Sequence, residues 1–136
     1  MADTRSPAVR APRSLGVPDV ITRKASGEPL VMVTAYDAPS ARAVDAAGVD
    51  MILVGDSVAM VVLGYDDTLH VTIDDLAHHT AAVARAKPRA LVVADLPWMS
   101  YHVSREETVR NAAQLVRAGA TAVKLEGGRK LSLIHI

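Results

Sequence analysis

Four short apolar segments alternate along this chain with segments of helical periodicity, and this alternation restricts the fold more than any other feature. The apolar segments are too short for helices and are bounded by turn residues, which is typical of buried strands. They cover residues 30–35, 51–54, 90–94 and 122–125. Each connection is long enough to hold a crossover helix, and such crossovers join parallel strands. The sequence therefore predicts a βαβαβαβ unit built on a parallel sheet.

Capping residues and glycines indicate where the connecting helices begin and end. Asp37 is suited to cap a helix that stops before Gly48. Thr72 has the spacing of a capping box with Asp75, three residues later. Gly119 follows the last periodic residue of the third crossover helix. In the second crossover helix, residues 76, 77, 83 and 84 form one apolar face.

Two architectures contain such a unit, and the residues alone leave both open. One is a doubly wound open sheet, and the other is a (β/α)8 barrel. A complete barrel needs about 250 residues, so the 136 residues of this chain would supply about half of one. Residues 1–18 are expected to form a flexible tail, followed by a short helix at 20–24 and, later, a long loop at 58–71.

The composition excludes several kinds of site and partner. The chain has no cysteine, so it contains neither disulfides nor thiolate metal ligands, and this absence fits a cytoplasmic protein. Its 15 basic and 15 acidic residues give zero formal charge, and no basic stripe points to nucleic-acid binding. No apolar run approaches the roughly 20 residues of a membrane-spanning helix. We therefore expect neither nucleic acid nor a membrane as a partner.

Acidic residues follow three of the four predicted strands. Asp56, Asp95 and Glu126 lie far apart in the sequence, but the C-terminal ends of parallel strands meet at one rim, where ligands bind. One acidic residue after a strand is usually a turn residue or a helix cap, and three in successive units leave a shared site and separate turn or cap roles equally open. Crowded carboxylates repel one another, and a divalent cation such as Mg²⁺ removes that cost.

Two further polar residues point to a small acid as the ligand of this rim. Lys124 precedes Glu126 by two residues, so both side chains lie on the same face of the strand, where Lys124 could pair with a substrate carboxylate. Ser57 follows Asp56, but its surroundings lack the last glycine of a GxSxG elbow. We therefore assign the Ser57 hydroxyl to substrate binding rather than to nucleophilic catalysis.

Five motifs, in order and with suitable spacing, resemble the ketopantoate hydroxymethyltransferase family. They are VTAYD at 33–37, LVGDS at 53–57, GYDDTL at 64–69, ADLP at 94–97 and VKLEGG at 123–128. The resemblance implies a (β/α)8 TIM barrel of the phosphoenolpyruvate/pyruvate superfamily type, truncated to about four strands. It also implies transfer of a hydroxymethyl group from 5,10-methylenetetrahydrofolate to 3-methyl-2-oxobutanoate, which gives 2-dehydropantoate for pantothenate biosynthesis.

The resemblance implies roles for individual residues as well. Asp56 and Asp95 would bind Mg²⁺ and contact the substrate, and Glu126 would belong to the metal environment. Ser57 and Lys124 would contact the oxo-acid. The Mg²⁺ ion would stabilise the enolate that forms when C3 of the oxo-acid loses a proton. The family's general base is a glutamate expected downstream of this chain, so no catalytic residue is assigned within it.

On this interpretation residues 19–128 form the N-terminal half of the barrel, and the full-length family assembles as a ring-like homo-decamer. Residues 129–136 do not follow the family pattern and are expected to reflect truncation or a shifted reading frame. Two alternatives stay open. One is an isocitrate-lyase-like C–C lyase of the same superfamily, and the other is a catalytically dead fragment.

Overall fold

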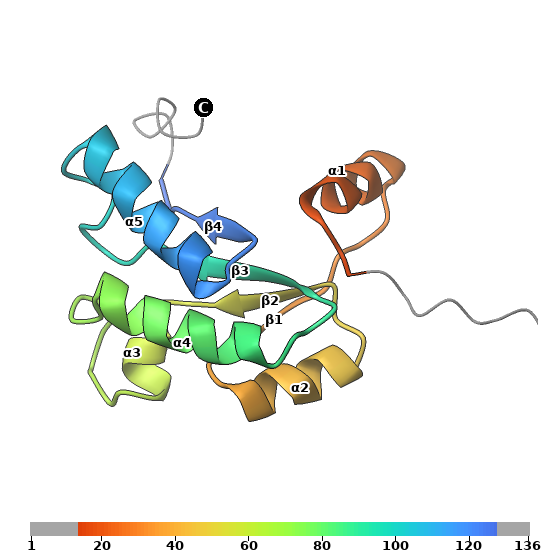
Figure 1. The fold of residues 1–136 in the computed structure, drawn as a ribbon, viewed down its shortest axis with the longest axis horizontal. Coiled ribbons are helices and arrows are strands. Elements are labelled where there is room, and N and C mark those ends of the chain that lie inside the picture. The colour runs from red at the N-terminus through yellow and green to blue at the C-terminus, as the bar shows by residue number, and fades with distance from the viewer. Residues whose placement is uncertain (1–13, 128–136) are drawn as a thin grey trace, which may run out of the picture.

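The computed structural model describes residues 14–127 (Figure 1). Its strands are β1 (Met32–Thr34), β2 (Met51–Val54), β3 (Leu91–Asp95) and β4 (Ala122–Lys124). Its helices are α1 (Val17–Ser26), α2 (Ala38–Ala46), α3 (Val58–Val61), α4 (Ile73–Arg85) and α5 (Arg105–Ala118). Most of the predicted 1–18 tail and all of the 129–136 segment lie outside the described residues. None of the helices described here is long and apolar enough to cross a membrane.

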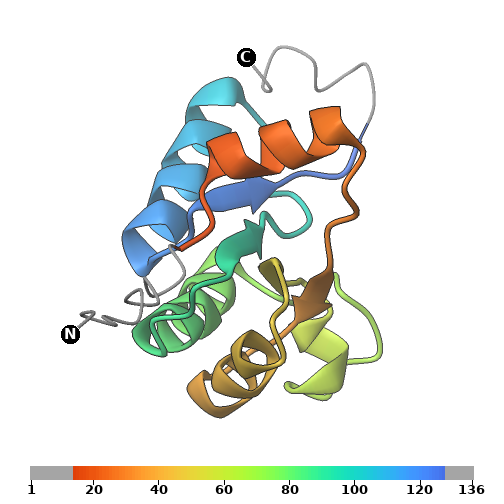
Figure 2. The same ribbon diagram turned by 90° about the vertical axis from the view of Figure 1, so that its right-hand side faces the viewer.

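The four strands form one parallel sheet in the order β1-β2-β3-β4, as the alternation of segments predicts. Consecutive strands are neighbours throughout, without the reversal of strand order that defines a doubly wound sheet. Helices α2, α4 and α5 pack against the strands and cover one face of the sheet (Figures 1 and 2). The observed order therefore favours the barrel-like alternative.

The core lies between this helical layer and the central strands. Leu76 and Val83 of α4, from the predicted apolar face, are fully buried, as is Leu115 of α5. They belong to one cluster with Ile52 and Val54 of β2. Every residue of β3 is buried, because this strand has a neighbour on each side and helix α4 against it. The centre of the sheet is thus its most buried part, and Asp95 is the last residue of β3.

The first strand differs from its prediction. A buried strand was expected at 30–35, but β1 is shorter and all three of its residues are exposed. Val31 and Met32 retain 54% and 44% of their accessible surface. The reason is position, because β1 is an edge strand that pairs only with β2 among the described residues. An apolar run shows that a segment is suited to burial, but it does not show whether a neighbour covers it.

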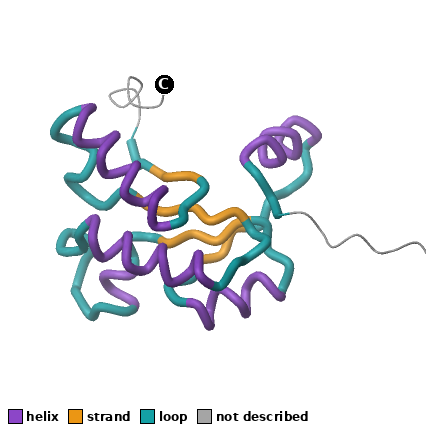
Figure 3. Tube along the Cα trace, viewed as in Figure 1, coloured by secondary structure: helices purple, strands orange, loops and turns teal. Residues whose placement is uncertain are grey.

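Two further segments differ from expectation in extent. Helix α1 runs from Val17 to Ser26, so it extends beyond the 20–24 helix and begins inside the predicted tail. It lies beyond the N-terminal ends of the strands (Figures 1 and 3), and Arg23 forms an ion pair there with Asp50. The predicted 58–71 loop contains the short helix α3, whose Val58 and Ala59 are fully buried. Packing of these two residues against the core stabilises α3, which the local sequence pattern does not predict.

The helix ends follow the predicted capping. The Thr72 hydroxyl accepts a hydrogen bond from the Asp75 backbone N–H at 3.2 Å, and the Thr72 N–H donates to the Asp75 carboxylate at 2.9 Å. The hydrogen bonds from Thr72 lower the pKa of Asp75 below its ordinary value. Gly48 and Gly119 both adopt positive φ, at +85° and +114°. Gly119 also approaches α4 so closely that a Cβ at this position would overlap the Cβ of Ala84.

We expect Gly119→Ala to destabilise the protein clearly more than Gly48→Ala. Both substitutions place a side chain at positive φ, which costs about 1–2 kcal/mol. At Gly48 this is the whole effect, because no atom lies within 4 Å of the added Cβ. The overlap with Ala84 adds about 1–3 kcal/mol for overpacking. Urea unfolding of each variant measures this difference in the free energy of unfolding.

The double variant Gly119→Ala with Ala84→Gly provides the control. Ala84→Gly alone should lower the free energy of unfolding by roughly 1 kcal/mol, as expected for a glycine in a helix. In the Gly119→Ala background it should cost less, because removing the Ala84 Cβ relieves the overlap. Equal losses from Gly48→Ala and Gly119→Ala would contradict the close packing of α4 against this turn.

Candidate active-site pocket at the strand tips

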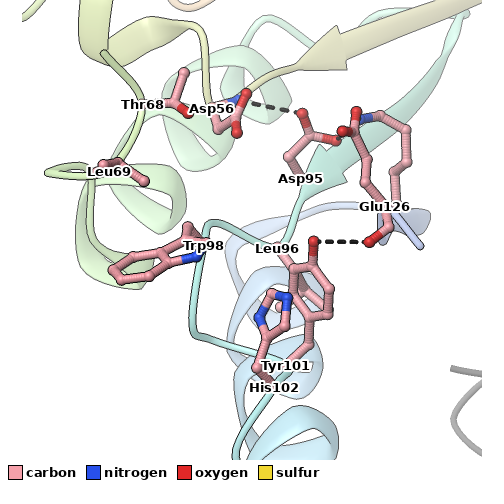
Figure 4. Close-up of a pocket in the computed structure, with 10 residues that line it drawn as sticks. Asp56, Thr68, Leu69, Asp95, Leu96, Trp98, Tyr101, His102 and Glu126 are labelled. Carbon is pink, nitrogen blue, oxygen red and sulfur yellow. Dashed lines mark hydrogen bonds and ion pairs between the residues drawn. The ribbon is translucent and has the colours of Figure 1, made fainter. Parts of the chain in front are cut away.

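A cavity of about 270 Å³ lies at the C-terminal ends of the strands (Figure 4). Its walls come from the segments that follow β2, β3 and β4, so residues distant in sequence meet there. Polar side chains dominate these walls, and they include Asp56, Asp95, Lys124 and Glu126. The predicted convergence of the strand-tip residues is therefore present in the structure for these four residues.

Asp95 is the most buried of the acidic residues in the cavity, with 4% of its surface accessible. Its Oδ2 accepts a hydrogen bond from the backbone N–H of Asp56 at 3.2 Å. Its buried Oδ1 lies 2.8 Å from the Nζ of Lys124, which forms an ion pair with it. Gly55 allows this approach, because a Cβ there would lie 3.4 Å from Asp95 Oδ2 and 3.0 Å from Ser57 Oγ.

Lys124 joins two of the strand-tip acids. Its ammonium contacts Asp95 Oδ1 at 2.8 Å and Glu126 Oε1 at 2.9 Å. Burial disfavours the charged ammonium, but hydrogen bonds to the two carboxylates and their negative charges outweigh it, so the pKa of Lys124 is raised. The side chain of Glu126 is 80% exposed, so solvent weakens that contact and the pair with Asp95 dominates.

The pKa of Asp95 is also raised, for the opposite reason. Burial penalises the charged carboxylate, and the contacts from Lys124 and from the Asp56 N–H only partly offset this penalty. Asp95 has a 6% exposed side chain, whereas that of Lys124 is 32% exposed. The carboxylate therefore loses more hydration than the ammonium, and this is why burial dominates the pKa of Asp95.

Ser57 lies beside this cavity and is oriented by Tyr36, which belongs to the VTAYD segment but has no role assigned from the sequence. The hydroxyls of Tyr36 and Ser57 are hydrogen-bonded at 2.8 Å. The Tyr36 carbonyl is in turn bonded to Nδ1 of His79 on α4 at 2.8 Å, and the two rings are in edge contact. Helix α4 thus holds the β1 tip in place and, through Tyr36, the Ser57 hydroxyl.

Other wall residues were equally hidden in the sequence. Trp98 and Tyr101 follow the Asp95-Leu96-Pro97 segment and line the cavity, and the Tyr101 hydroxyl donates to the Glu126 carbonyl at 3.1 Å (Figure 4). Thr68 lies next to Asp56, on the side away from Glu126 (Figure 4). Thr68 belongs to the GYDDTL segment at 64–69, but no role follows from that, whereas for Trp98 and Tyr101 the available signal was their position in the loop after a strand end.

The acidic residues have the donor chemistry for a hard divalent cation, although they are not assembled as a three-ligand cluster. Carboxylates of Asp56 and Asp95 line one cavity, and the Asp95 carboxylate is buried with the Lys124 ammonium as its charged partner. Within that range no group of three or more His, Cys, Asp or Glu side chains is placed to hold a metal ion. Lys124 lies between Asp95 and Glu126, so a cation at Asp95 would compete with its ammonium. The metal assignment stays a prediction.

Comparison with known proteins gives a consistent result. The family model described as ketopantoate hydroxymethyltransferase matches residues 14–136. A protein named 3-methyl-2-oxobutanoate hydroxymethyltransferase from Ignicoccus hospitalis is 59% identical over 120 residues, which are 88% of this chain and 46% of that protein. The protein of the same name from Bacillus subtilis is 57% identical over 111 residues, or 81% and 40% of the two chains. The chain spans less than half the length of these relatives.

Solved structures identify the fold. A crystal structure of 2,3-dimethylmalate lyase, described as a member of the PEP mutase/isocitrate lyase superfamily, matches with a TM-score of 0.57 and 25% identity. The match covers 76% of this chain and 37% of that one. Oxaloacetate acetylhydrolase matches with a TM-score of 0.62 over 82% of this chain and 40% of the other, and at 17% identity it shows the fold alone. The predicted part of a phosphoenolpyruvate/pyruvate-superfamily barrel is thereby confirmed.

The Lys124→Met substitution is expected to raise the pKa of Asp95 further. Methionine has a similar length but removes the positive charge that partly offsets the burial of the carboxylate. Carboxyl carbon NMR shifts recorded against pH measure the titration of Asp95 directly. Lys24→Met in α1 removes one charge far from the cavity and should leave this titration unchanged. An unaltered Asp95 titration in Lys124→Met would contradict the ion pair.

Proposed function

The chain belongs to the ketopantoate hydroxymethyltransferase family, and we propose that it forms the metal- and oxo-acid-binding part of an enzyme that acts on 3-methyl-2-oxobutanoate. In the proposed reaction, 5,10-methylenetetrahydrofolate and water supply a hydroxymethyl group to C3 of the oxo-acid. A proton leaves C3, a C–C bond forms, and the products are 2-dehydropantoate and tetrahydrofolate. The observation that carries the proposal is the buried Asp95 carboxylate, paired with Lys124 in a polar cavity at the strand tips.

Lys124 and Ser57 are suited to bind the oxo-acid. The carboxylate group of the substrate offers the Lys124 ammonium a partner outside the protein, replacing the exposed Glu126 carboxylate. The Ser57 hydroxyl, held by Tyr36 at 2.8 Å, can donate to a substrate oxygen. Both groups are held on the sheet or on the turn that follows it, so the substrate would be oriented before any bond changes.

Asp56 and Asp95 are the residues that we propose as Mg²⁺ ligands, with Glu126 as an outer contact. Mg²⁺ takes oxygen ligands and keeps several waters, so two protein carboxylates are a sufficient donor set. When bound, the ion supplies positive charge beside the oxo-acid oxygens and so favours loss of the C3 proton. Because Lys124 Nζ contacts Asp95 Oδ1, metal binding would release Lys124 toward the substrate carboxylate. We place the proton acceptor outside residues 14–127.

The lyase alternative receives less support. The 2,3-dimethylmalate lyase structure shares the fold with this chain at 25% identity. The proteins named hydroxymethyltransferases are 57–59% identical to it over 110 residues or more. The strand-tip cavity by itself does not distinguish a transferase from a lyase. The difference in identity therefore favours the transferase.

We expect this chain to bind Mn²⁺, an EPR-visible substitute for Mg²⁺, more tightly when 3-methyl-2-oxobutanoate is present. Asp95→Asn should weaken Mn²⁺ binding by at least about tenfold, since a charged ligand contact is worth about 1.5–3 kcal/mol. Lys124→Met should tighten binding of the metal alone, because the competing ammonium is gone, yet remove the enhancement by the oxo-acid. Glu106→Gln, on the exposed start of α5, is the matched control. Metal binding that is indifferent to Asp95 would rule out the assigned site.

The reaction itself can be tested in a chimera that carries residues 14–127 in place of the matching segment of the Bacillus subtilis relative. In D₂O we expect Mg²⁺-dependent exchange of the C3 proton of 3-methyl-2-oxobutanoate. When the one-carbon donor is added, we also expect tetrahydrofolate to form as the second product. NMR of the substrate measures the exchange. The unaltered relative is the positive control, and Asp95→Asn in the chimera should abolish exchange. A folded chimera that binds metal and oxo-acid without exchange would refute the proposed reaction.

A further inference from the structure

A second groove adjoins the strand-tip cavity and has no role in the function proposed above. It has a volume of about 350 Å³ and lies between the loop after β3 and the start of helices α4 and α5. Leu69 and Trp98 line both the groove and the strand-tip cavity. A molecule seated in the groove would therefore lie directly beside an oxo-acid in the cavity.

The loop that separates the two spaces is held in a fixed shape. Ser100 donates hydrogen bonds to the Pro97 carbonyl from its N–H at 3.1 Å and from its hydroxyl at 2.7 Å. Asn111 of α5 donates to the Ser100 carbonyl at 2.7 Å. Between these anchors Met99 adopts a positive φ of +66°, a strained conformation that occurs preferentially at ligand sites. The backbone is thus held so that large apolar side chains face solvent.

Trp98 gives the groove a flat aromatic wall. Its side chain is 53% exposed, although its neighbours Pro97 and Ser100 are buried. Leu69 and Met99, also in the groove walls, are 52% and 42% exposed, and Figure 4 shows Leu69 next to the indole. An exposed indole on an anchored loop is suited to stack against a flat ring.

One acidic residue lines the same groove. Glu107 lies in the first turn of α5 and lines the groove wall. Its backbone N–H is bonded to the Ser104 hydroxyl at 3.1 Å, while its carboxylate makes no ion pair with another described residue. A carboxylate beside an aromatic wall is complementary to a flat ring with adjacent N–H donors, since two parallel hydrogen bonds can form.

We propose that this groove binds the pterin ring of the reduced-folate donor, with the ring against Trp98 and its amino-pyrimidinone edge against Glu107. The inference rests on the proposed function, because that reaction needs a second substrate next to the first. The groove volume is at the lower end of ligand sites, which suits a bicyclic head and leaves the benzoylglutamate tail outside. The shared Leu69–Trp98 wall then directs the one-carbon unit toward the oxo-acid.

The single tryptophan of the chain makes the proposal directly measurable. We expect 5-formyltetrahydrofolate, a stable reduced folate, to shift the one indole N–H signal in an NMR titration of the 136-residue chain. p-Aminobenzoylglutamate, which lacks the pterin, should leave this signal in place. Glu107→Gln should weaken reduced-folate binding roughly tenfold or more, because a charge-assisted hydrogen bond is lost, while the Ser104 cap is kept.

Glu106→Gln is the matched control, because it changes the neighbouring residue of the same turn, which does not line the groove. Equal weakening by Glu106→Gln and Glu107→Gln, or an indole shift by p-aminobenzoylglutamate as large as that by the folate, would overturn the proposal. Binding of Mn²⁺ and the oxo-acid, measured on the same samples, separates the two ideas. Intact Mn²⁺ and oxo-acid binding with no folate-induced indole shift would refute the groove assignment alone.

Discussion

The ion pair between Asp95 and Lys124 is the interaction on which the site depends. It joins the C-terminal ends of β3 and β4 at 2.8 Å, and it places a nearly fully buried carboxylate beside an ammonium that solvent still reaches. Burial raises the pKa of Asp95, whereas the carboxylates of Asp95 and Glu126 raise the pKa of Lys124. A pair so unequal in hydration is suited to exchange partners, because each member can bind an external ion of opposite charge.

The sheet supports this pair through its most buried strand. Every residue of β3 is buried, and the glycine after β2 lets the next turn approach Asp95. By contrast β1 is exposed and β4 only half-buried. Contacts from the rim partly compensate, since His79 of α4 holds the Tyr36 carbonyl and Tyr36 holds Ser57. The site is therefore most rigid at Asp95 and is supported by side-chain contacts toward β1.

Sequence reasoning was most accurate where a local signal had one physical cause. The Thr72 cap, the glycine stops and the parallel order follow from hydrogen-bonding geometry, positive φ and crossover length, and all were confirmed. It was wrong for the burial of β1, because edge position depends on neighbours and not on composition. It also missed the short helix α3, whose Val58 and Ala59 are buried in the core, and the role of Tyr36, whose hydroxyl is bonded to that of Ser57, 21 positions away.

The sequence by itself determined the alternation of strands and helices, the acidic residues at the strand ends and the family to which the chain belongs. These properties depend on residue type and spacing along the chain. Only the tertiary structure decided how the acids are partnered. It placed Lys124 between Asp95 and Glu126, where the sequence had suggested three carboxylates around a metal. Distances between strand tips depend on strand register, sheet twist and side-chain rotamers. The order of residue types along the chain does not reveal these three properties.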